Sequence, residues 1–91
     1  MVAKNIMIIV HGSVQSVSFR SFAKENADAL NIRGYAKNLK DGTVKIVAEG
    51  DDQKLEEFIE KIKVGPPNAK VENVAIIERG YLQNIPAFET F

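Results

Sequence analysis

Residues 6–20 read Ile6-Met7-Ile8-Ile9-Val10-His11-Gly12-Ser13-Val14-Gln15-Ser16-Val17-Ser18-Phe19-Arg20. The continuous apolar run at 6–10 predicts a buried β-strand. A short loop of small residues follows it. Apolar residues along one stripe then predict a helix from Phe19 to about Asn31, with Ser18 as its N-cap. The chain therefore opens with a strand that passes through a tight loop into a helix.

The rest of the chain alternates strand patterns with one further helix. The predicted elements are a strand over 32–39, a hairpin turn at Asp41-Gly42, a strand over 43–49, a helix between Asp51-Asp52 and Gly65-Pro66-Pro67, a strand over 71–78 and a short strand over 88–91. Polar and apolar residues alternate over 43–49, which predicts one buried and one water-exposed face. This order is typical of the ferredoxin-like α+β sandwich, in which two helices cover one face of an antiparallel sheet.

The predicted topology has a consequence for the loop after the first strand. The strands over 6–10 and 32–39 should run parallel, with the strand over 43–49 between them, so both end at the same edge of the sheet. The loop and Asn38 should then lie about two strand spacings apart, roughly 10 Å. A phosphate and one water fit in that space.

Composition limits the possible functions. Residues 1–91 are predicted to form a single domain, because a chain of this length encloses one modest core. Twelve basic and twelve acidic residues give no net charge, which disfavours nucleic-acid and membrane-surface partners. The absence of cysteine and the single histidine disfavour disulfides, thiolate chemistry and a metal site. Without a leader or a long apolar run, we expect a cytoplasmic protein.

The loop itself indicates an anion site. Unpaired backbone N–H groups and the positive end of a helix dipole converge where a strand, a loop and a helix start meet. Arg20 would add a planar fork of donors suited to phosphate, although a solvated helix arginine is the alternative. Asn38 could orient a water or simply cap its turn. His11 has no identifiable carboxylate partner, which favours a structural role over a general base.

These residue types suit a reaction whose leaving group needs no proton. A carboxylate leaving from a carboxylic-phosphoric anhydride has a parent pKa of about 4, so a general acid is unnecessary. The protein would hold the phosphoryl group, neutralise its charge and aim a water at it.

Two motifs in this chain resemble the signatures of the acylphosphatase family. Residues 12–20 resemble G-x-V-Q-G-V-x-F-R, and residues 34–44 resemble G-[WY]-[AV]-x-N-x-x-D-G-[ST]-V. The resemblance implies an enzyme without cofactor or metal that hydrolyses acyl phosphates, with inorganic phosphate as product and competitive inhibitor. We expect a monomer, although the residues do not decide the oligomeric state. The resemblance also implies that Arg20 binds the phosphate and Asn38 orients the attacking water. The implied cradle consists of the backbone amides of Gln15, Ser16, Val17, Ser18 and Phe19.

Ser16 departs from this pattern, because the family has glycine there. If the position requires positive φ, serine costs roughly 1 kcal/mol or more and can displace the cradle. A catalytically weak or inactive anion-binding module of the same fold is therefore the alternative. An RNA-binding domain is disfavoured, because residues 43–49 lack aromatic stacking residues. A piece of a larger carbamoyl-transfer enzyme is disfavoured by a 91-residue chain that begins with Met1.

Overall fold

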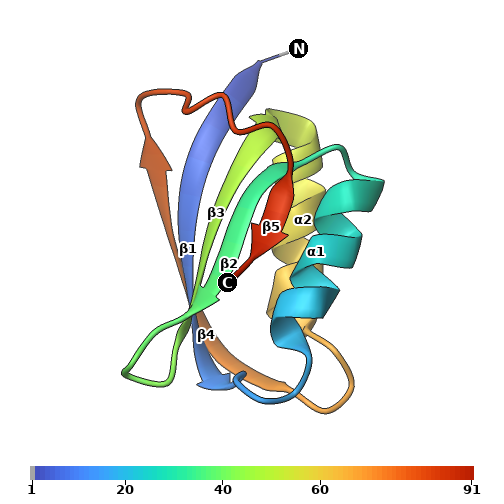
Figure 1. The fold of residues 1–91 in the computed structure, drawn as a ribbon, viewed down its shortest axis with the longest axis vertical. Coiled ribbons are helices and arrows are strands. Elements are labelled where there is room, and N and C mark those ends of the chain that lie inside the picture. Colours follow the sequence, from blue (N-terminus) through green and yellow to red (C-terminus); the bar gives the residue numbers. More distant parts are fainter. Residues whose placement is uncertain (1) are drawn as a thin grey trace.

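The computed structural model describes residues 2–91, which form five strands and two helices (Figure 1). In chain order the elements are β1 (Ala3–Ser13), α1 (Phe19–Ala29), β2 (Arg33–Asn38), β3 (Val44–Asp51), α2 (Asp52–Val64), β4 (Lys70–Arg79) and β5 (Phe88–Thr90). Every element expected from the sequence is present, and the bounds differ by a few residues at the ends, where helices and strands fray. None of the helices in residues 2–91 has the length and apolar character needed to cross a membrane.

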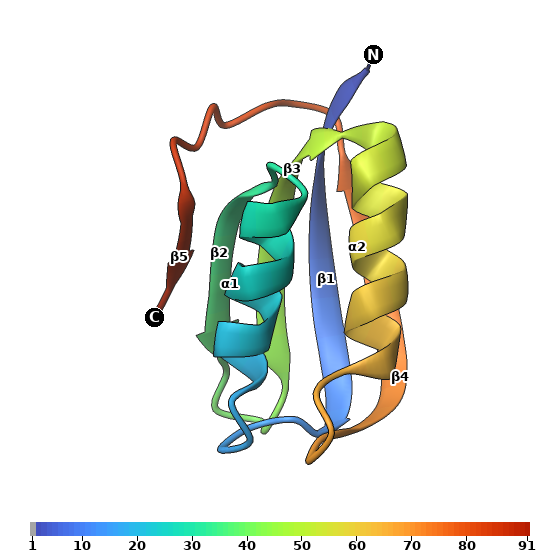
Figure 2. The ribbon, with the colours of Figure 1, turned by 90° about the vertical axis from the view of Figure 1, so that its right-hand side faces the viewer.

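The strands form one sheet in the order β4-β1-β3-β2-β5. Strand β1 is antiparallel to β3 and β4, and β2 is antiparallel to β3. Both helices lie on the same face of this sheet (Figure 2). The ferredoxin-like α+β prediction is therefore confirmed.

The last strand makes the sheet mixed rather than antiparallel throughout. Strand β5 pairs in parallel with β2, with Gly34 opposite Phe88 and Ala36 opposite Thr90. The reason is visible in Figure 1: the chain leaves β4 at one end of the sheet, crosses that end and enters β5 beside the start of β2. Residues 80–87 thus bridge the two edges of the sheet.

The core lies between the sheet and the helices. Alternate residues of β1, namely Ile6, Ile8 and Val10, face the helices and are buried. The helices contribute their buried stripes: Phe19, Ala23, Ala27, Leu55, Phe58 and Ile62. Burial of these apolar faces, at about 25 cal/mol per Å² of apolar surface, is the main stabilising contribution to the fold.

Ser18 does not cap α1 through its side chain, contrary to the prediction. Its φ is 61°, in the left-handed region, and its hydroxyl makes no capping hydrogen bond. A capping side chain requires extended backbone at the N-cap. Only the main-chain oxygen of Ser18 serves the helix, by accepting from the N–H of Phe22 at 3.0 Å.

The prediction that β3 has one water-exposed face was also wrong. Val47 and Glu49 point away from the helices, yet Val47 is fully buried and Glu49 is 1% exposed. Val47 is paired with Met7 of β1 on one side and with Tyr35 of β2 on the other. Because β3 lies between these two strands, its neighbours cover Val47. Glu49 is covered by the segment that follows β4, whose backbone binds the carboxylate.

Candidate active site

The loop between β1 and α1 lies at the sheet edge where β2 also ends (Figures 1 and 2). Because β3 separates β1 from β2, the loop and Asn38 flank one strand, as the sequence predicted. Ser16 and Ser18 have φ values of 62° and 61°. Left-handed residues spaced in this way turn successive N–H groups toward one side, as in backbone nests that bind anions.

The backbone of the loop is free to bind a ligand. In residues 2–91, no N–H group from Gln15 to Ser18 donates a hydrogen bond to another part of the chain. The side chains of Val17 and Phe19 pack against or within the core, so these residues can offer only their backbone to an anion. The predicted cradle therefore has unsatisfied donors, and its apolar side chains anchor it.

The side chain of Gln15 has a role that the sequence analysis missed. Its Nε2 donates to the main-chain oxygens of Leu39, at 2.8 Å, and Thr43, at 2.9 Å. The oxygen of Thr43 also accepts from the N–H of Leu39, at 2.9 Å. Gln15 therefore fastens the loop to the β2–β3 turn, immediately beside Asn38.

Asn38 carries an unsatisfied acceptor at this edge. Its Oδ1 is the buried side-chain polar atom in residues 2–91 that has no hydrogen-bond partner. Leaving a buried acceptor unpaired costs about 1–3 kcal/mol, and such an atom in a native protein calls for a bound donor. A water held at Oδ1 would satisfy it.

Arg20 lies in the first turn of α1 and reaches toward the same edge. Its guanidinium Nη1 donates to the main-chain oxygen of Phe91. The N–H of Phe91 in turn donates to the oxygen of Ala36 in β2, at 2.9 Å. Through Phe91, Arg20 is thus held beside Ala36 of β2, which comes two residues before Asn38 in the sequence. The guanidinium keeps further N–H donors for a ligand.

His11 and Asp41 do not form a catalytic pair. Asp41 Oδ1 accepts from Thr43 Oγ1 at 2.6 Å and from Thr43 N at 3.0 Å, as expected for a residue that closes a turn. These hydrogen bonds, with a smaller effect of the charge on His11, hold the pKa of the Asp41 carboxyl below its ordinary value. His11 makes no hydrogen bond through its side chain to any residue from 2 to 91.

Similarity to known proteins identifies the family of this chain. A sequence profile described as acylphosphatase matches residues 6–90. The chain belongs to the acylphosphatase family. It is 43% identical over 82 residues to an acylphosphatase of Archaeoglobus fulgidus, covering 90% of this chain and 91% of the relative.

Solved structures agree with this assignment. The crystal structure of acylphosphatase from Bacillus subtilis matches with a TM-score of 0.94 and 38% identity, over 97% of this chain and 98% of that one. The HypF structure from T. kodakarensis matches with a TM-score of 0.84 and 36% identity, over 97% of this chain and 12% of HypF. The same fold therefore occurs alone and within a longer chain.

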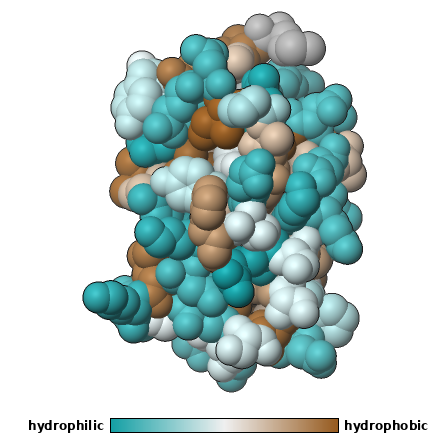
Figure 3. Space-filling view, in the orientation of Figure 1, coloured by the Kyte–Doolittle hydropathy of each residue, from teal (hydrophilic) through white to brown (hydrophobic). Residues whose placement is uncertain are grey.

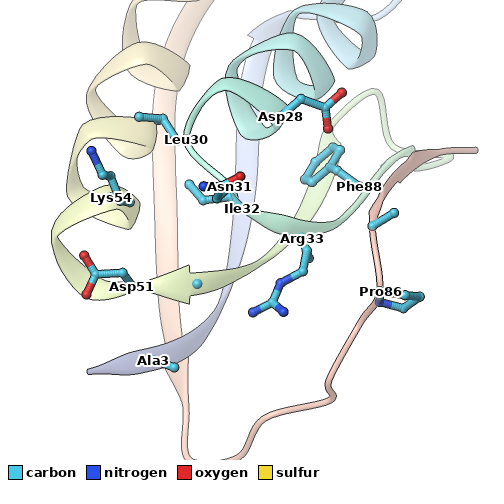
Figure 4. Close-up of a pocket in the computed structure, with 12 residues that line it drawn as sticks. Ala3, Asp28, Leu30, Asn31, Ile32, Arg33, Asp51, Lys54, Pro86 and Phe88 are labelled. Carbon is cyan, nitrogen blue, oxygen red and sulfur yellow. The ribbon is translucent and has the colours of Figure 1, made fainter. Parts of the chain in front are cut away.

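One hollow of the molecule lies away from this edge. It has a volume of about 670 Å³, and its lining includes Asp28, Arg33, Asp51 and Lys54 (Figure 4). These residues belong to the end of α1, the start of β2, the end of β3 and the start of α2, and these element ends lie at the opposite end of the sheet from the loop between β1 and α1 (Figure 1). The candidate site is therefore recognised by its free N–H donors and its unpaired Asn38 oxygen.

Proposed function

We propose that this acylphosphatase binds the phosphoryl group of an acyl phosphate in the Gln15–Phe19 loop and hydrolyses it by in-line attack of a water held by Asn38. The observation that carries the proposal is the buried, unpartnered Oδ1 of Asn38 beside a loop with free N–H donors. The chain is an enzyme of the acylphosphatase type, and its family does not favour the inactive anion-binding module.

Arg20 and the loop share the work of binding. Backbone N–H groups donate hydrogen bonds to the negatively charged phosphoryl oxygens, and the guanidinium adds charge-assisted hydrogen bonds. Arg20 also carries the positive charge that compensates the charge growing on those oxygens in the transition state. Because the loop is anchored by Gln15 and by buried side chains, these donors are fixed before the substrate arrives.

Asn38 supplies the geometry of attack. Its Oδ1 accepts a hydrogen bond from the water, which directs the water oxygen toward phosphorus on the side opposite the acyl oxygen. A bond forms between the water oxygen and phosphorus while the bond from phosphorus to the acyl oxygen breaks. The carboxylate leaves with that electron pair, and the protons of the water pass to the released phosphate and to solvent.

The experiment is hydrolysis of benzoyl phosphate, followed by its loss of ultraviolet absorbance, with and without chelator and inorganic phosphate. We expect turnover that survives the chelator and falls with added phosphate as competitor. Loss of turnover with chelator would contradict the metal-free mechanism. Phosphate binding without turnover of benzoyl, acetyl or carbamoyl phosphate would instead indicate a binding module.

The proposal extends to the setting of the enzyme. We expect a monomer in the cytoplasm that binds small acyl phosphates and neither nucleic acid nor membranes. The balanced charge of the chain supports this view, as does the face shown in Figure 3, where hydrophobic residues are scattered among hydrophilic ones. Sedimentation equilibrium and cell fractionation test the two expectations separately.

A further inference from the structure

A row of polar side chains crosses the sheet face that carries no helix. Arg79 of β4 is paired with Asn5 of β1, and Asn5 is paired with Glu49 of β3. Arg79 Nε donates to Asn5 Oδ1 at 2.8 Å, and Asn5 Nδ2 donates to Glu49 Oε2 at 2.9 Å. Glu49 is 1% exposed, so this carboxylate is buried although it lies on the outer face.

The same carboxylate binds the backbone of the segment that follows β4. Glu49 Oε2 accepts from the N–H of Gln83 at 2.6 Å, and Oε1 accepts from the N–H of Ile85 at 3.1 Å. Arg79 Nη2 donates to Gln83 Oε1 at 2.9 Å, which ties the segment to the polar row at a second point. Both carboxylate oxygens therefore hold an irregular stretch that makes no ladder of its own there.

This stretch leads directly to Arg20. The N–H of Gly34 donates to the oxygen of Ala87 at 3.0 Å, and Lys24 Nζ donates to the oxygen of Phe88 at 2.9 Å. The end of β5 brings Phe91 to Ala36, where the main-chain oxygen of Phe91 accepts from Arg20. Glu49 holds one end of the C-terminal segment, and Arg20 contacts the other.

A buried carboxylate is costly unless its oxygens are satisfied. Here the donors are N–H groups of Gln83 and Ile85 together with the amide of Asn5. An apolar residue could cover the sheet at this position but could not bind those N–H groups. The charge at Glu49 therefore holds residues 83–85 against the sheet before the chain enters β5.

We propose that Glu49 is a positioning residue for the active site: by holding residues 83–85 it places Phe91 against Arg20, so that the guanidinium is fixed before phosphate binds. This inference rests on the proposed role of Arg20. A loose arginine must be ordered when the ligand arrives, and ordering one long side chain costs about 0.5–1.5 kcal/mol, equivalent to roughly a two- to tenfold weaker affinity. Ground-state and transition-state binding lose equally, so KM should rise while kcat changes little.

The test compares wild type with Glu49→Gln and with Glu57→Gln, an exposed glutamate of α2, as the matched control. In Glu49→Gln one carboxylate oxygen becomes an NH₂ group, which faces N–H donors and cannot accept from them. The substitution should therefore release residues 83–85. We expect KM for benzoyl phosphate and Kd for inorganic phosphate to rise roughly two- to tenfold, with kcat within about twofold. Amide exchange should accelerate at Gly34 and Phe91, and the control should match wild type.

A chain that lacks Phe91 supplies a second readout. If Glu49 acts through Phe91, adding Glu49→Gln to that chain should change the phosphate Kd no further. The inference would be overturned if Glu49→Gln weakened phosphate binding equally in the full chain and in the chain that lacks Phe91. It would also be overturned if Glu49→Gln in the full chain left the phosphate Kd unchanged and lowered only Tm and kcat. If Glu49→Gln does not fold, Asn5→Ala removes one donor and should shift the Kd in the same direction by less; an unshifted Kd would also overturn it.

The phosphate Kd separates this inference from the proposed function. A wild-type protein that binds phosphate without hydrolysing benzoyl phosphate would refute the proposed mechanism while leaving the effect of Glu49 on binding measurable. A wild-type protein that hydrolyses benzoyl phosphate, with Glu49→Gln unchanged in KM and Kd, would refute only the positioning role.

Discussion

Gln15 Nε2 lies 2.8 Å from the main-chain oxygen of Leu39 and donates a hydrogen bond to it. This contact joins the loop between β1 and α1 to the turn that follows Asn38, although 24 residues separate the two in the sequence. We therefore expect this amide side chain to help set the position of the proposed phosphate cradle relative to the attacking water.

Replacing Gln15 should lower both catalysis and stability. Gln15→Ala removes two hydrogen bonds to main-chain oxygens, each worth about 0.5–1.5 kcal/mol. A loop shifted by about 1 Å can lower the rate by about 10². We expect kcat/KM for benzoyl phosphate to fall by at least tenfold while chemical denaturation shows a loss of about 1–3 kcal/mol. Exposed Gln53 offers the control Gln53→Ala, and equal kinetics in both variants would contradict the role of Gln15.

Asn38→Ala should lower kcat and leave phosphate affinity nearly intact. The substitution removes the acceptor that we propose to hold the water, but no group that is proposed to contact the phosphoryl oxygens. Loss of one oriented catalytic contact predicts a decrease in kcat of roughly 10² or more. The measurements are turnover of benzoyl phosphate and calorimetric titration with inorganic phosphate. Asn73→Ala, on the exposed part of β4, is the control, and full turnover by Asn38→Ala would exclude the water-orienting role.

Arg20→Ala should weaken binding and turnover together, which distinguishes it from Asn38→Ala. In the proposed mechanism the guanidinium contacts the phosphoryl group in both the ground state and the transition state, so the phosphate Kd should rise and kcat/KM should fall. A charge-assisted hydrogen bond is worth about 1.5–3 kcal/mol, equivalent to roughly a ten- to hundredfold loss of affinity. Arg33→Ala, at the opposite end of β2, should bind phosphate like wild type. Unchanged phosphate affinity in Arg20→Ala would contradict its role.

Periodicity and turn residues were sufficient to predict the order of the elements, because each signal is local. The apolar run at 6–10 and the Asp41-Gly42 turn both fall where the structure has a strand and a hairpin. The edge shared by the loop and Asn38 then followed from topology alone. The sequence was therefore sufficient to predict that the loop before Arg20 and the end of the strand that carries Asn38 lie at one edge of the sheet.

The features that were missed depend on contacts between distant segments. Glu49 is buried by residues 83–85, which carry no periodic pattern, so its alternation within β3 predicted exposure. The partners of Gln15 are main-chain oxygens, which leave no signal in the residue types. The left-handed backbone of Ser18 runs against the ordinary preference of serine at a helix start. This backbone occurs in the loop whose N–H groups make no hydrogen bond within residues 2–91.

Ser16→Gly should raise activity. The φ of Ser16 is 62°, so serine occupies a region that glycine reaches without steric cost, and relief of that strain favours the cradle conformation by about 1 kcal/mol. The greater freedom of glycine in the unfolded chain offsets much of this gain in global stability, so Tm should move little. We expect a higher kcat/KM for benzoyl phosphate. An unchanged or lower turnover would contradict the idea that Ser16 limits activity.

Acid should weaken the hold of Glu49 on the C-terminal segment. Burial alone raises the pKa of the Glu49 carboxyl, but hydrogen bonds from Asn5, Gln83, Ile85 and Asn84 outweigh it and hold that pKa below its ordinary value. A carboxyl with a depressed pKa in the folded state stabilises the fold above its unfolded value of about 4.3 and loses that contribution as pH falls through the folded pKa. Near neutral pH the wild-type protein should therefore have a larger free energy of unfolding than Glu49→Gln. The difference between the two proteins should shrink below about pH 4.3. Urea titrations of both proteins across pH 3–7 measure this, and a difference that stays constant with pH would mean that the charge of Glu49 does not hold the segment.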